Sequence, residues 1–318
     1  EISNEYIPYS DELQLKLHDV ILKGYLADIK VISQLNQEYK DSINNFIKKN
    51  NLEIDLIAMH GQTVYHDQKT KISIQLFDKS IRFNTHSPII CNFRKNDLLN
   101  GGNGAPIMPE FHRVLANQLG LKKVIFVNIG GVTNITVIDN QKITAGDSSF
   151  GNAIVNDLIY EKTKERFDVD GSLSNNGQKI DDLFKYITSD EYFLENLPKS
   201  LDRNSFHKYL ANFIKERKLN NAIYTLLEVI PFAINSLISS HSDFKIILMG
   251  GGRKNLTLKK IFKKYFNDVS LIDIYNMNGD FIESQGMAYL GIRYLIKKHS
   301  TYFTTTNVLK NIYLGERC

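Results

Sequence analysis

The stretch from Val124 to Asp157 constrains the fold of this chain more than any other part of the sequence. Its apolar and β-branched runs predict three successive strands, Val124–Val127, Ile135–Ile138 and Lys142–Thr144, joined by a glycine turn at Gly130-Gly131 and a polar turn at Asp139-Asn140. A carboxylate, Asp147, comes next, and Gly151-Asn152 marks the expected start of a helix that runs to Lys164.

The residues of this stretch are typical of a phosphate-binding site with a general base beside it. Glycines at a tight turn let backbone N–H groups approach an anion closely. A helix that starts at Asn152 is expected to present unsatisfied N–H groups and the positive end of its dipole. Asp147 lies between them in sequence and could take a proton. The alternative is a β-hairpin in which the glycines are needed only for the turn and bind no ligand.

Two further strands are expected to end in glycine or polar clusters. Ile54–Met59 runs into His60-Gly61-Gln62-Thr63, and Lys245–Met249 runs into Gly250-Gly251-Gly252, followed by Asn255 and a helix. Ligands of open α/β sheets collect beyond the carboxyl ends of strands. The alternative for the first cluster is a strand-end turn with a hydrogen-bonded histidine. Neither a Walker sequence nor a strand followed by GxGxxG is present.

The most glycine-dense segment, Gly101–Pro106, is either a surface loop or a place where backbone meets a ligand. Arg94 and Asp97 precede it, a short strand is expected at Ile89–Cys91, and Glu110-Phe111-His112 follows. This mixture of residue types favours a site.

Helical spacing of apolar residues predicts most of the remaining elements. The expected helices include 11–35, 38–49, 180–187, 205–216, 281–297 with Glu283 in its first turn, and 220–239 with a kink or break at Pro231. The structure of the last segment, 300–318, is left open.

Composition excludes several classes of protein. The 318 residues are 42% hydrophobic and 23% charged, which is ordinary for a globular protein of one or two domains. The net charge of +4 is spread along the chain, so nucleic acid is not an expected partner. No run of membrane-spanning length and no signal peptide pattern is present. Cys91 and Cys318 are too few for a disulfide framework, and no metal site is expected, so a reducing cytoplasm is the expected location.

Seven motifs in order resemble those of the anhydro-N-acetylmuramic acid kinase family, within the actin/hexokinase/Hsp70-like ATPase superfamily. They are HGQTVYH (60–66), NFRKND with GGNGAPIMPEFH (92–112), VNIGGVTNIT (127–136), GDSSFGN (146–152), LPKSLDRNSF (197–206), MGGGRKN (249–255) and the helix that carries Glu283.

The resemblance implies an α/β fold of two actin-like, ribonuclease H-like domains flanking a cleft. Domain I would comprise 1–118, with 281–318 packing back on it, and domain II would comprise 119–280. The implied enzyme of peptidoglycan recycling uses ATP and Mg²⁺ to open the anhydro bond of the amino sugar and phosphorylate O6, as a homodimer.

The resemblance also implies roles for individual residues. Asp147 would be the catalytic base. The sugar side would be formed by His60, Gln62, Thr63, Arg94, Asp97, Gly104 and Glu283. The nucleotide side would be formed by Asn128, Gly130, Gly131, Asn152, Gly250, Gly251, Gly252 and Asn255.

The sequence also departs from the family pattern. The family's N-terminal strand and its phosphate loop, Gly-Thr-Ser-x-Asp-Gly, have no equivalent here, so we expect an N-terminally truncated first domain. Ser149 and Phe150 replace a glycine and a proline, Asn92 replaces an aspartate, and Asn103 replaces a glutamine. The hypothesis is a kinase whose activity is impaired or absent. The alternatives are a non-catalytic remnant that keeps the fold and binds sugar, and another sugar kinase of the superfamily.

Overall fold

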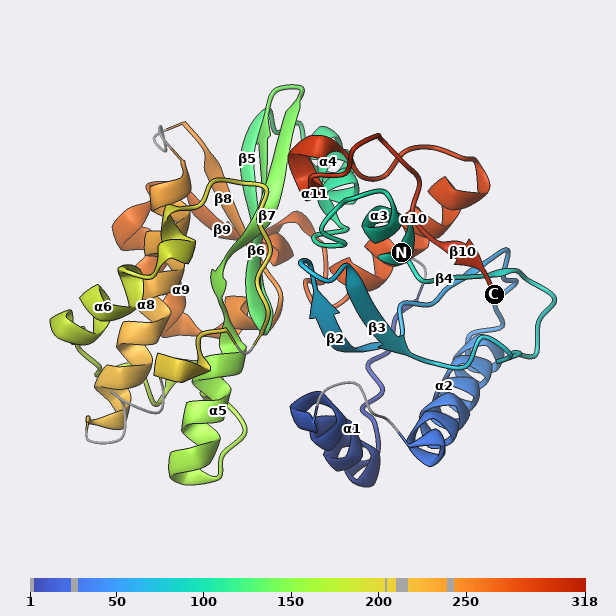
Figure 1. Cartoon of the computed structure of the whole chain (residues 1–318), viewed down its shortest axis with the longest axis horizontal. Helices are drawn as coiled ribbons and strands as arrows, with labels where there is room; N and C mark the ends of the chain where they lie inside the picture. Colours follow the sequence, from blue (N-terminus) through green and yellow to red (C-terminus); the bar gives the residue numbers. More distant parts are fainter. Residues whose placement is uncertain (1–2, 24–27, 204, 210–216, 239–242) are drawn as a thin grey trace. The chain divides into compact units, whose positions relative to one another are not determined.

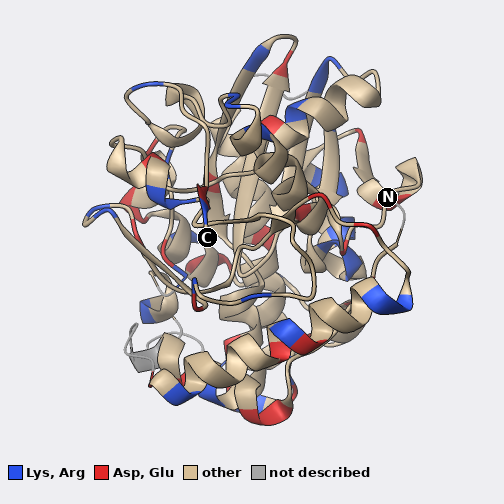
Figure 2. Cartoon of the chain, turned by 90° about the vertical axis from the view of Figure 1, so that its right-hand side faces the viewer, with Lys and Arg blue, Asp and Glu red and all other residues tan. Residues whose placement is uncertain are grey.

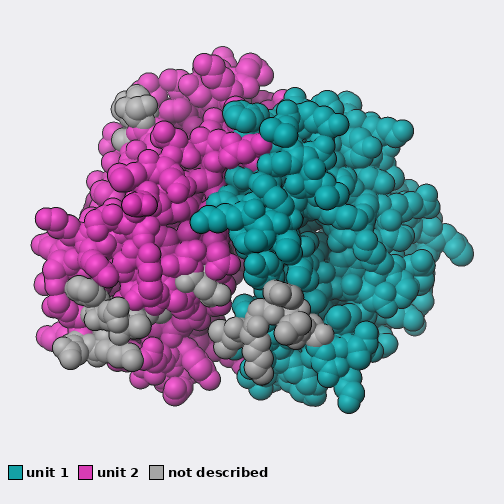
Figure 3. All heavy atoms as spheres, in the orientation of Figure 1, with its two compact units in different colours: residues 1–108, 283–303, 308–318 teal, residues 109–282, 304–307 magenta. Residues whose placement is uncertain are grey.

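The structure is a computed structural model, and it describes residues 3–23, 28–203, 205–209, 217–238 and 243–318. The chain forms two compact units (Figures 1 and 3). Unit 1 comprises residues 1–108, 283–303 and 308–318, and unit 2 comprises residues 109–282 and 304–307. Both units contain helices and strands, which confirms the α/β class.

Unit 2 is built on a five-stranded sheet in the order β7-β6-β5-β8-β9. β6 pairs antiparallel with both β5 and β7, whereas β8 and β9 run parallel to β5. The strands are β5 (Lys123–Ile129), β6 (Val132–Asp139), β7 (Lys142–Phe150), β8 (Lys245–Met249) and β9 (Val269–Leu271). The helices are α4 (Pro109–Gln118), α5 (Asn152–Thr163), α6 (Asp181–Thr188), α8 (Leu219–Leu237), α9 (Leu256–Tyr265) and α11 (Phe303–Thr306), with short 3₁₀ turns at Val169–Gly171, Glu191–Leu194, Gly251–Lys254 and Ile272–Tyr275.

The two faces of this sheet carry different residues because side chains alternate along each strand. On one face Ile125, Val127 and Ile129 belong to the main hydrophobic core, which also contains buried residues of α5, α8 and α9. On the other face the α4 residue His112 stacks on Phe126, with ring centroids 5.2 Å apart, and its Nδ1 lies 2.8 Å from Thr136 Oγ1. Burial lowers the pKa of His112 to about 3, so this histidine is a neutral core residue at pH 7.

Unit 1 contains a three-stranded sheet, β1-β4-β10, and a two-stranded hairpin, β2-β3. The strands are β1 (Ile57–Ala58), β2 (Gln62–Asp67), β3 (Ile72–Leu76), β4 (Ile89–Cys91) and β10 (Glu316–Arg317). The helices are α1 (Asp11–Lys23), α2 (Ile29–Lys49), α3 (Lys95–Leu99) and α10 (Ile282–Leu295). Leu13, Leu17 and Leu35 of α1 and α2 pack with Val64 and Leu76 of the hairpin.

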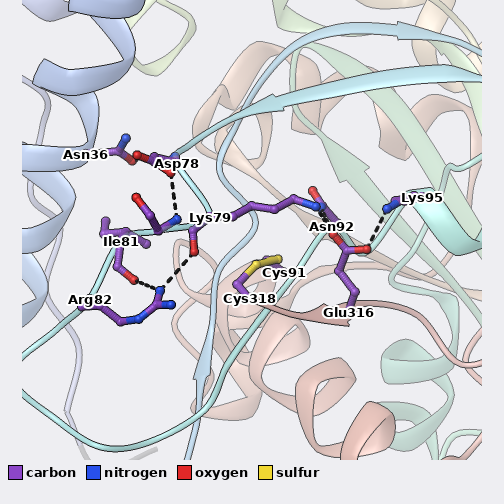
Figure 4. The surroundings of a disulfide bond; sticks show 11 residues. Asn36, Asp78, Lys79, Ile81, Arg82, Cys91, Asn92, Lys95, Glu316 and Cys318 are labelled. Atoms are coloured by element: carbon purple, nitrogen blue, oxygen red, sulfur yellow. Dashed lines mark hydrogen bonds and ion pairs between the residues drawn. A yellow bond between two sulfur atoms is a disulfide. The ribbon is translucent and has the colours of Figure 1, made fainter.

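The end of the chain is joined to β4 in unit 1 (Figure 4). Cys318 forms a disulfide with Cys91, and β10 pairs antiparallel with β4. The carboxylate of Glu316 accepts hydrogen bonds from Lys79, Lys95 and Asn92. Burial alone would raise the pKa of Glu316, but these donors outweigh it and lower the pKa to about 2. The pairing of the two cysteines was not predicted from the sequence, and the structure of this last segment had been left open.

Several predicted boundaries are wrong. The predicted break at residues 36–37, between helices 11–35 and 38–49, is absent, because α2 runs unbroken from Ile29 to Lys49. His60–Thr63 is not only a strand-end turn, because Gln62 and Thr63 begin strand β2. Helix α4 was not predicted, and α8 continues through Pro231 without a break. Most of the helix predicted at 205–216 lies outside the described residues.

Charged residues of both signs are interspersed along the ribbon in Figure 2. Within the described residues, none of the helices has the length and apolar character needed to cross a membrane.

Candidate functional site

Strand register decides which face of the unit 2 sheet carries Asp147. From the hairpin turn onward, β6 and β7 pair without interruption, from Asp139 with Lys142 to Asn134 with Asp147. A shift of one residue would place Asp147 opposite Ile135, whose side chain is in the core. A bulge follows, with Ser148 as the extra residue before Thr133 pairs with Ser149, and bulges are frequent beside active sites. The register therefore places Asp147 on the face away from the core.

On that face Asp147 ends a row of polar residues across three strands. Asn128 of β5 pairs with Asn134 of β6, and Asn134 pairs with Asp147 of β7. Directly opposed residues project on the same side of a sheet, with Cβ atoms about 5 Å apart. The row comes immediately after the one in which Thr136 contacts His112 of α4. Asn134 is absent from the predicted site, although its place in the VNIGGVTNIT motif was a usable signal.

The backbone around Asp147 is held by a segment that follows the 3₁₀ turn at Glu191–Leu194. The Asp147 N–H donates to the Lys199 carbonyl at 2.8 Å, and the Leu201 N–H donates to Asp147 Oδ2 at 2.8 Å. The Tyr192 hydroxyl donates to the Asp147 carbonyl oxygen at 2.5 Å. Only 6% of Asp147 is exposed, so these contacts fix a nearly buried carboxylate.

The glycine turn after β5 is packed onto the start of α5. The N–H groups of Gly151, Asn152 and Ala153 donate to the carbonyls of Gly130 and Gly131 at 2.7–3.2 Å. The prediction of unsatisfied N–H groups at this helix start is therefore wrong for these three residues, because the turn itself occupies them. Asn152 also donates through Nδ2 to the Ile129 carbonyl at 3.2 Å, which ties the helix to β5.

The second glycine turn, after β8, packs against the first. Gly250 has a φ of +71° and lies against the Asn128 amide oxygen and the Ile129 carbonyl, where a Cβ would clash. Gly252 is similarly close to the Ile129 side chain, and Asn152 Nδ2 lies near the positions that a Cβ would take on Gly251 and Gly252. The structure thus brings together the predicted nucleotide residues of both turns in one unit.

Asn255, next to the second glycine turn, stabilises the surrounding structure through its side-chain hydrogen bonds. Its Oδ1 accepts from the Leu258 N–H at 2.9 Å, which caps α9, and its Nδ2 donates to Asp168 at 3.2 Å. With 8% of its surface exposed, Asn255 anchors the loop that contains Asp168.

In unit 1 the predicted sugar residues gather around His60 and Arg94. The His60 Nδ1–H donates to the Gly61 carbonyl at 2.9 Å, and its Nε2 accepts from Arg94 Nε at 3.2 Å. Burial and then the Arg94 charge lower the pKa of His60 to about 4, which keeps the ring neutral and able to accept. Arg94 also donates to the Gly104 carbonyl at 2.9 Å, so it joins the histidine to the glycine-rich loop.

Asp97 also binds the glycine-rich loop that contains Gly102 and Gly104. Its side chain is fully buried, its Oδ2 accepts from the Gly104 N–H at 2.7 Å, and it lies directly against Gly102. These contacts give Asp97 a role in shaping the loop.

The remaining predicted residues of unit 1 differ in their surroundings. Thr63 Oγ1 is buried and has no hydrogen-bond partner among the described residues. Gln62 Nε2 donates to the Thr63 carbonyl at 3.2 Å, and Glu283 is exposed in the first turn of α10. His66, which was not predicted, lies against Gly104.

Comparison with known proteins identifies the family. A profile of the family described as "Anhydro-N-acetylmuramic acid kinase" matches residues 1–317. The chain is 34% identical to the anhydro-N-acetylmuramic acid kinase of Pelagibacter ubique, over 83% of this chain and 74% of that protein. It is 32% identical to the one of Methylobacterium nodulans, over 95% of this chain and 85% of that protein.

Among solved structures, the activator of the 2-hydroxyisocaproyl-CoA dehydratase from Clostridium difficile aligns with a TM-score of 0.37 and 12% identity, over 67% of this chain and 69% of that one. This likeness is too weak to carry an argument. The profile match spans almost the entire chain, and the relatives match along most of their own lengths. The chain therefore belongs to the anhydro-N-acetylmuramic acid kinase family.

Proposed function

We propose that this family member uses ATP to convert 1,6-anhydro-N-acetylmuramic acid into N-acetylmuramic acid 6-phosphate, with Asp147 as the general base. The observation that carries the proposal is the strand register that pairs Asn128 with Asn134 and Asn134 with Asp147. This register supports Asp147 as the base, because it puts a nearly buried carboxylate on the same face as Asn128, the residue that leads into the first glycine turn.

The proposed reaction couples hydrolysis to phosphoryl transfer. Asp147 takes a proton from a water molecule as the water oxygen bonds to C1 of the sugar. The C1–O6 bond breaks, its electron pair stays on O6, and O6 attacks the γ-phosphorus of ATP, with ADP as the leaving group. The hydrogen bond from the Leu201 N–H to Asp147 Oδ2 favours the ionised carboxylate that this step needs.

The nucleotide would bind at the two packed glycine turns of unit 2. Asn128, Gly130 and Gly131 would face the phosphates, and Gly250–Gly252 would face the adenosine, with Asn152 joining the turns. Asn255 would contribute by holding α9 in place. The antiparallel strands β5–β7 followed by the parallel strands β8 and β9 support an actin-like domain.

Magnesium would reach the site with ATP. Mg²⁺ is usually held by nucleotide phosphates and one or two side-chain oxygens, so it needs no dedicated cluster of ligands. None of the described residues form a group of three or more His, Cys, Asp or Glu placed to hold a metal. The side-chain oxygens of Asn128 and Asn134, in the row of Asp147, fit a phosphate-bound ion. When bound, the ion would neutralise charge on the transferring phosphate.

The sugar would be recognised by unit 1. Arg94, oriented by His60 and Gly104, supplies a fixed cation, and Thr63 supplies a buried hydroxyl that has no protein partner among the described residues. Gln62 and Glu283 would add polar contacts. The family resemblance also supports a homodimer in the cytoplasm, and light scattering after size-exclusion chromatography would test the oligomer.

The decisive experiment is an assay of ADP release with the anhydro sugar. We expect sugar-dependent turnover in the wild-type chain and a loss of about 100-fold or more in Asp147→Asn, because general bases contribute about 10²–10⁴-fold. Asp139→Asn, at the far end of β6, is the matched control and should retain activity. Sugar-dependent turnover that survives in Asp147→Asn would refute the assignment of the base. Absence of turnover in the wild type would favour the non-catalytic remnant.

A further inference from the structure

Lys199 is a buried lysine next to Asp147 that the proposed reaction leaves without a role. Only 4% of the residue is exposed. Its Nζ donates to the Tyr192 carbonyl at 2.6 Å and lies 4.1 Å from the centroid of the Tyr192 ring. Burying an ammonium group is unfavourable, and a cation is retained in such a place only with compensating partners.

The backbone of Lys199 lies directly against the strand that carries Asp147. A Cβ on Gly146 would come within 2.7 Å of the Lys199 carbonyl oxygen and 2.8 Å of its nitrogen, so this approach requires a glycine. The Lys199 carbonyl accepts from the Asp147 N–H, and Leu201, two residues further on, donates to the Asp147 carboxylate. The segment therefore contacts both the main chain and the side chain of Asp147.

The Lys199 side chain is also linked to Asp147, indirectly, through Tyr192. The ammonium group holds the Tyr192 carbonyl and ring, and the Tyr192 hydroxyl donates to the Asp147 carbonyl oxygen at 2.5 Å. Burial, and then the negative charges of Asp147 and Glu195, raise the pKa of Tyr192, so its hydroxyl remains a donor.

We propose that Lys199 is a positioning residue for Asp147, one that fixes the Asp147 main chain through Tyr192 and its side chain through Leu201, and that holds the carboxylate ionised with its buried ammonium charge. The kinetic part of this inference rests on the proposed function, whereas the electrostatic part does not.

The charged and titratable groups around Asp147 support this assignment. Burial lowers the pKa of Lys199 to about 8, although the charges of Glu195 and Asp147 act to raise it. The interaction is mutual, so the ammonium group favours the charged form of Asp147. Glu195 is exposed and screened by solvent. His112 of α4 is neutral, and the β5 and β6 neighbours in the row are the amides Asn128 and Asn134.

The direct test measures the protonation of Asp147 without turnover. The chain would be labelled with ¹³C at the aspartate carboxyl carbons, and the Asp147 signal would be identified by its loss in Asp147→Asn. In Lys199→Met, which keeps the apolar stem and removes the charge, the signal should titrate at a pH about one unit higher than in wild type. In the wild type a smaller step near pH 8 should report deprotonation of Lys199. An unchanged titration midpoint of Asp147 in Lys199→Met would overturn the proposal. If Lys199→Met does not fold, the wild type decides, and the absence of its step near pH 8 would overturn the proposal.

The kinetic test uses the pH profile of kcat/KM. In Lys199→Met the acid limb should move to a pH about one unit higher, with about tenfold lower activity below the limb and activity within a few-fold of wild type near pH 8. Lys208→Met, which removes an exposed lysine paired with Asp190, should leave the limb in place. A uniform loss at every pH would indicate a structural role alone and would contradict the inference. An inactive wild type would refute the proposed function, and the carboxyl titration would still decide the role of Lys199.

Discussion

At the scale of single residues, the structure separates buried polar groups that have partners in the protein from buried polar groups that have none among the described residues. Asp97 and Asn255 are both nearly or fully buried, and each uses its oxygens on backbone N–H groups of its own unit. Thr63 has a buried hydroxyl without such a partner in the described part of the chain. A sequence motif contains both kinds of residue side by side, and only the contacts distinguish them.

Glu316 gives a prediction about acid stability. Its pKa is lowered from 4.5 to about 2 in the folded chain, so the stability it contributes is fully present above about pH 4.5 and is lost as the pH falls toward 2. Glu316→Gln should lower the melting temperature at pH 6, and the difference from wild type should shrink as the pH falls from 5 to 2. Thermal melts across this range would check it. A difference that stays constant with pH would contradict the assignment.

At the scale of elements, a strand register and a helix start decide which polar groups lie at the ends of the unit 2 strands. The pairing of β6 with β7 turns Asp147 toward the polar row, and the carbonyls of Gly130 and Gly131 occupy the first N–H groups of α5. An anion at these strand ends must therefore be bound by other groups than the N–H groups of residues 151–153.

Shifting β7 by one residue should remove activity. Deletion of Thr144, which lies between the hairpin turn and Asp147, would bring Asp147 opposite Ile135 and turn its carboxylate toward the core, which is unfavourable for a charged group. We expect loss of turnover and a lower melting temperature. Ser148→Ala is the control, because it keeps the register and loses only a hydrogen bond to the Thr133 carbonyl, worth about 1 kcal/mol. Full activity in the deletion variant would disprove the role of the register.

At the scale of the whole molecule, the disulfide links residues 227 apart in sequence. The closed loop includes every described residue of unit 2, so the disulfide limits how far the unfolded chain can expand. Reducing conditions such as those of the cytoplasm keep most protein thiols free, which makes the state of this pair dependent on its surroundings.

Oxidation should therefore stabilise the chain. Under oxidising conditions we expect wild type to be about 2–4 kcal/mol more stable to urea than Cys318→Ser, and we expect this difference to disappear with a reducing agent. Thiol titration of the denatured chain should find both cysteines blocked before reduction and both free after it. Equal stability of the two proteins under oxidising conditions would show that the disulfide contributes nothing.

The sequence alone determined the α/β class, the strands at Ile89–Cys91 and Lys245–Met249, and the family, because apolar periodicity and motif order are properties of the local chain. It also predicted Asp147 and both glycine turns as site residues, and these roles stay predictions. Only the tertiary structure decided the face on which Asp147 lies, the use of the N–H groups at the start of α5, the contacts of Lys199 and the pairing of Cys91 with Cys318. These depend on strand register and on contacts between distant segments. A shift of one residue in register reverses the direction of a side chain while leaving the local pattern unchanged.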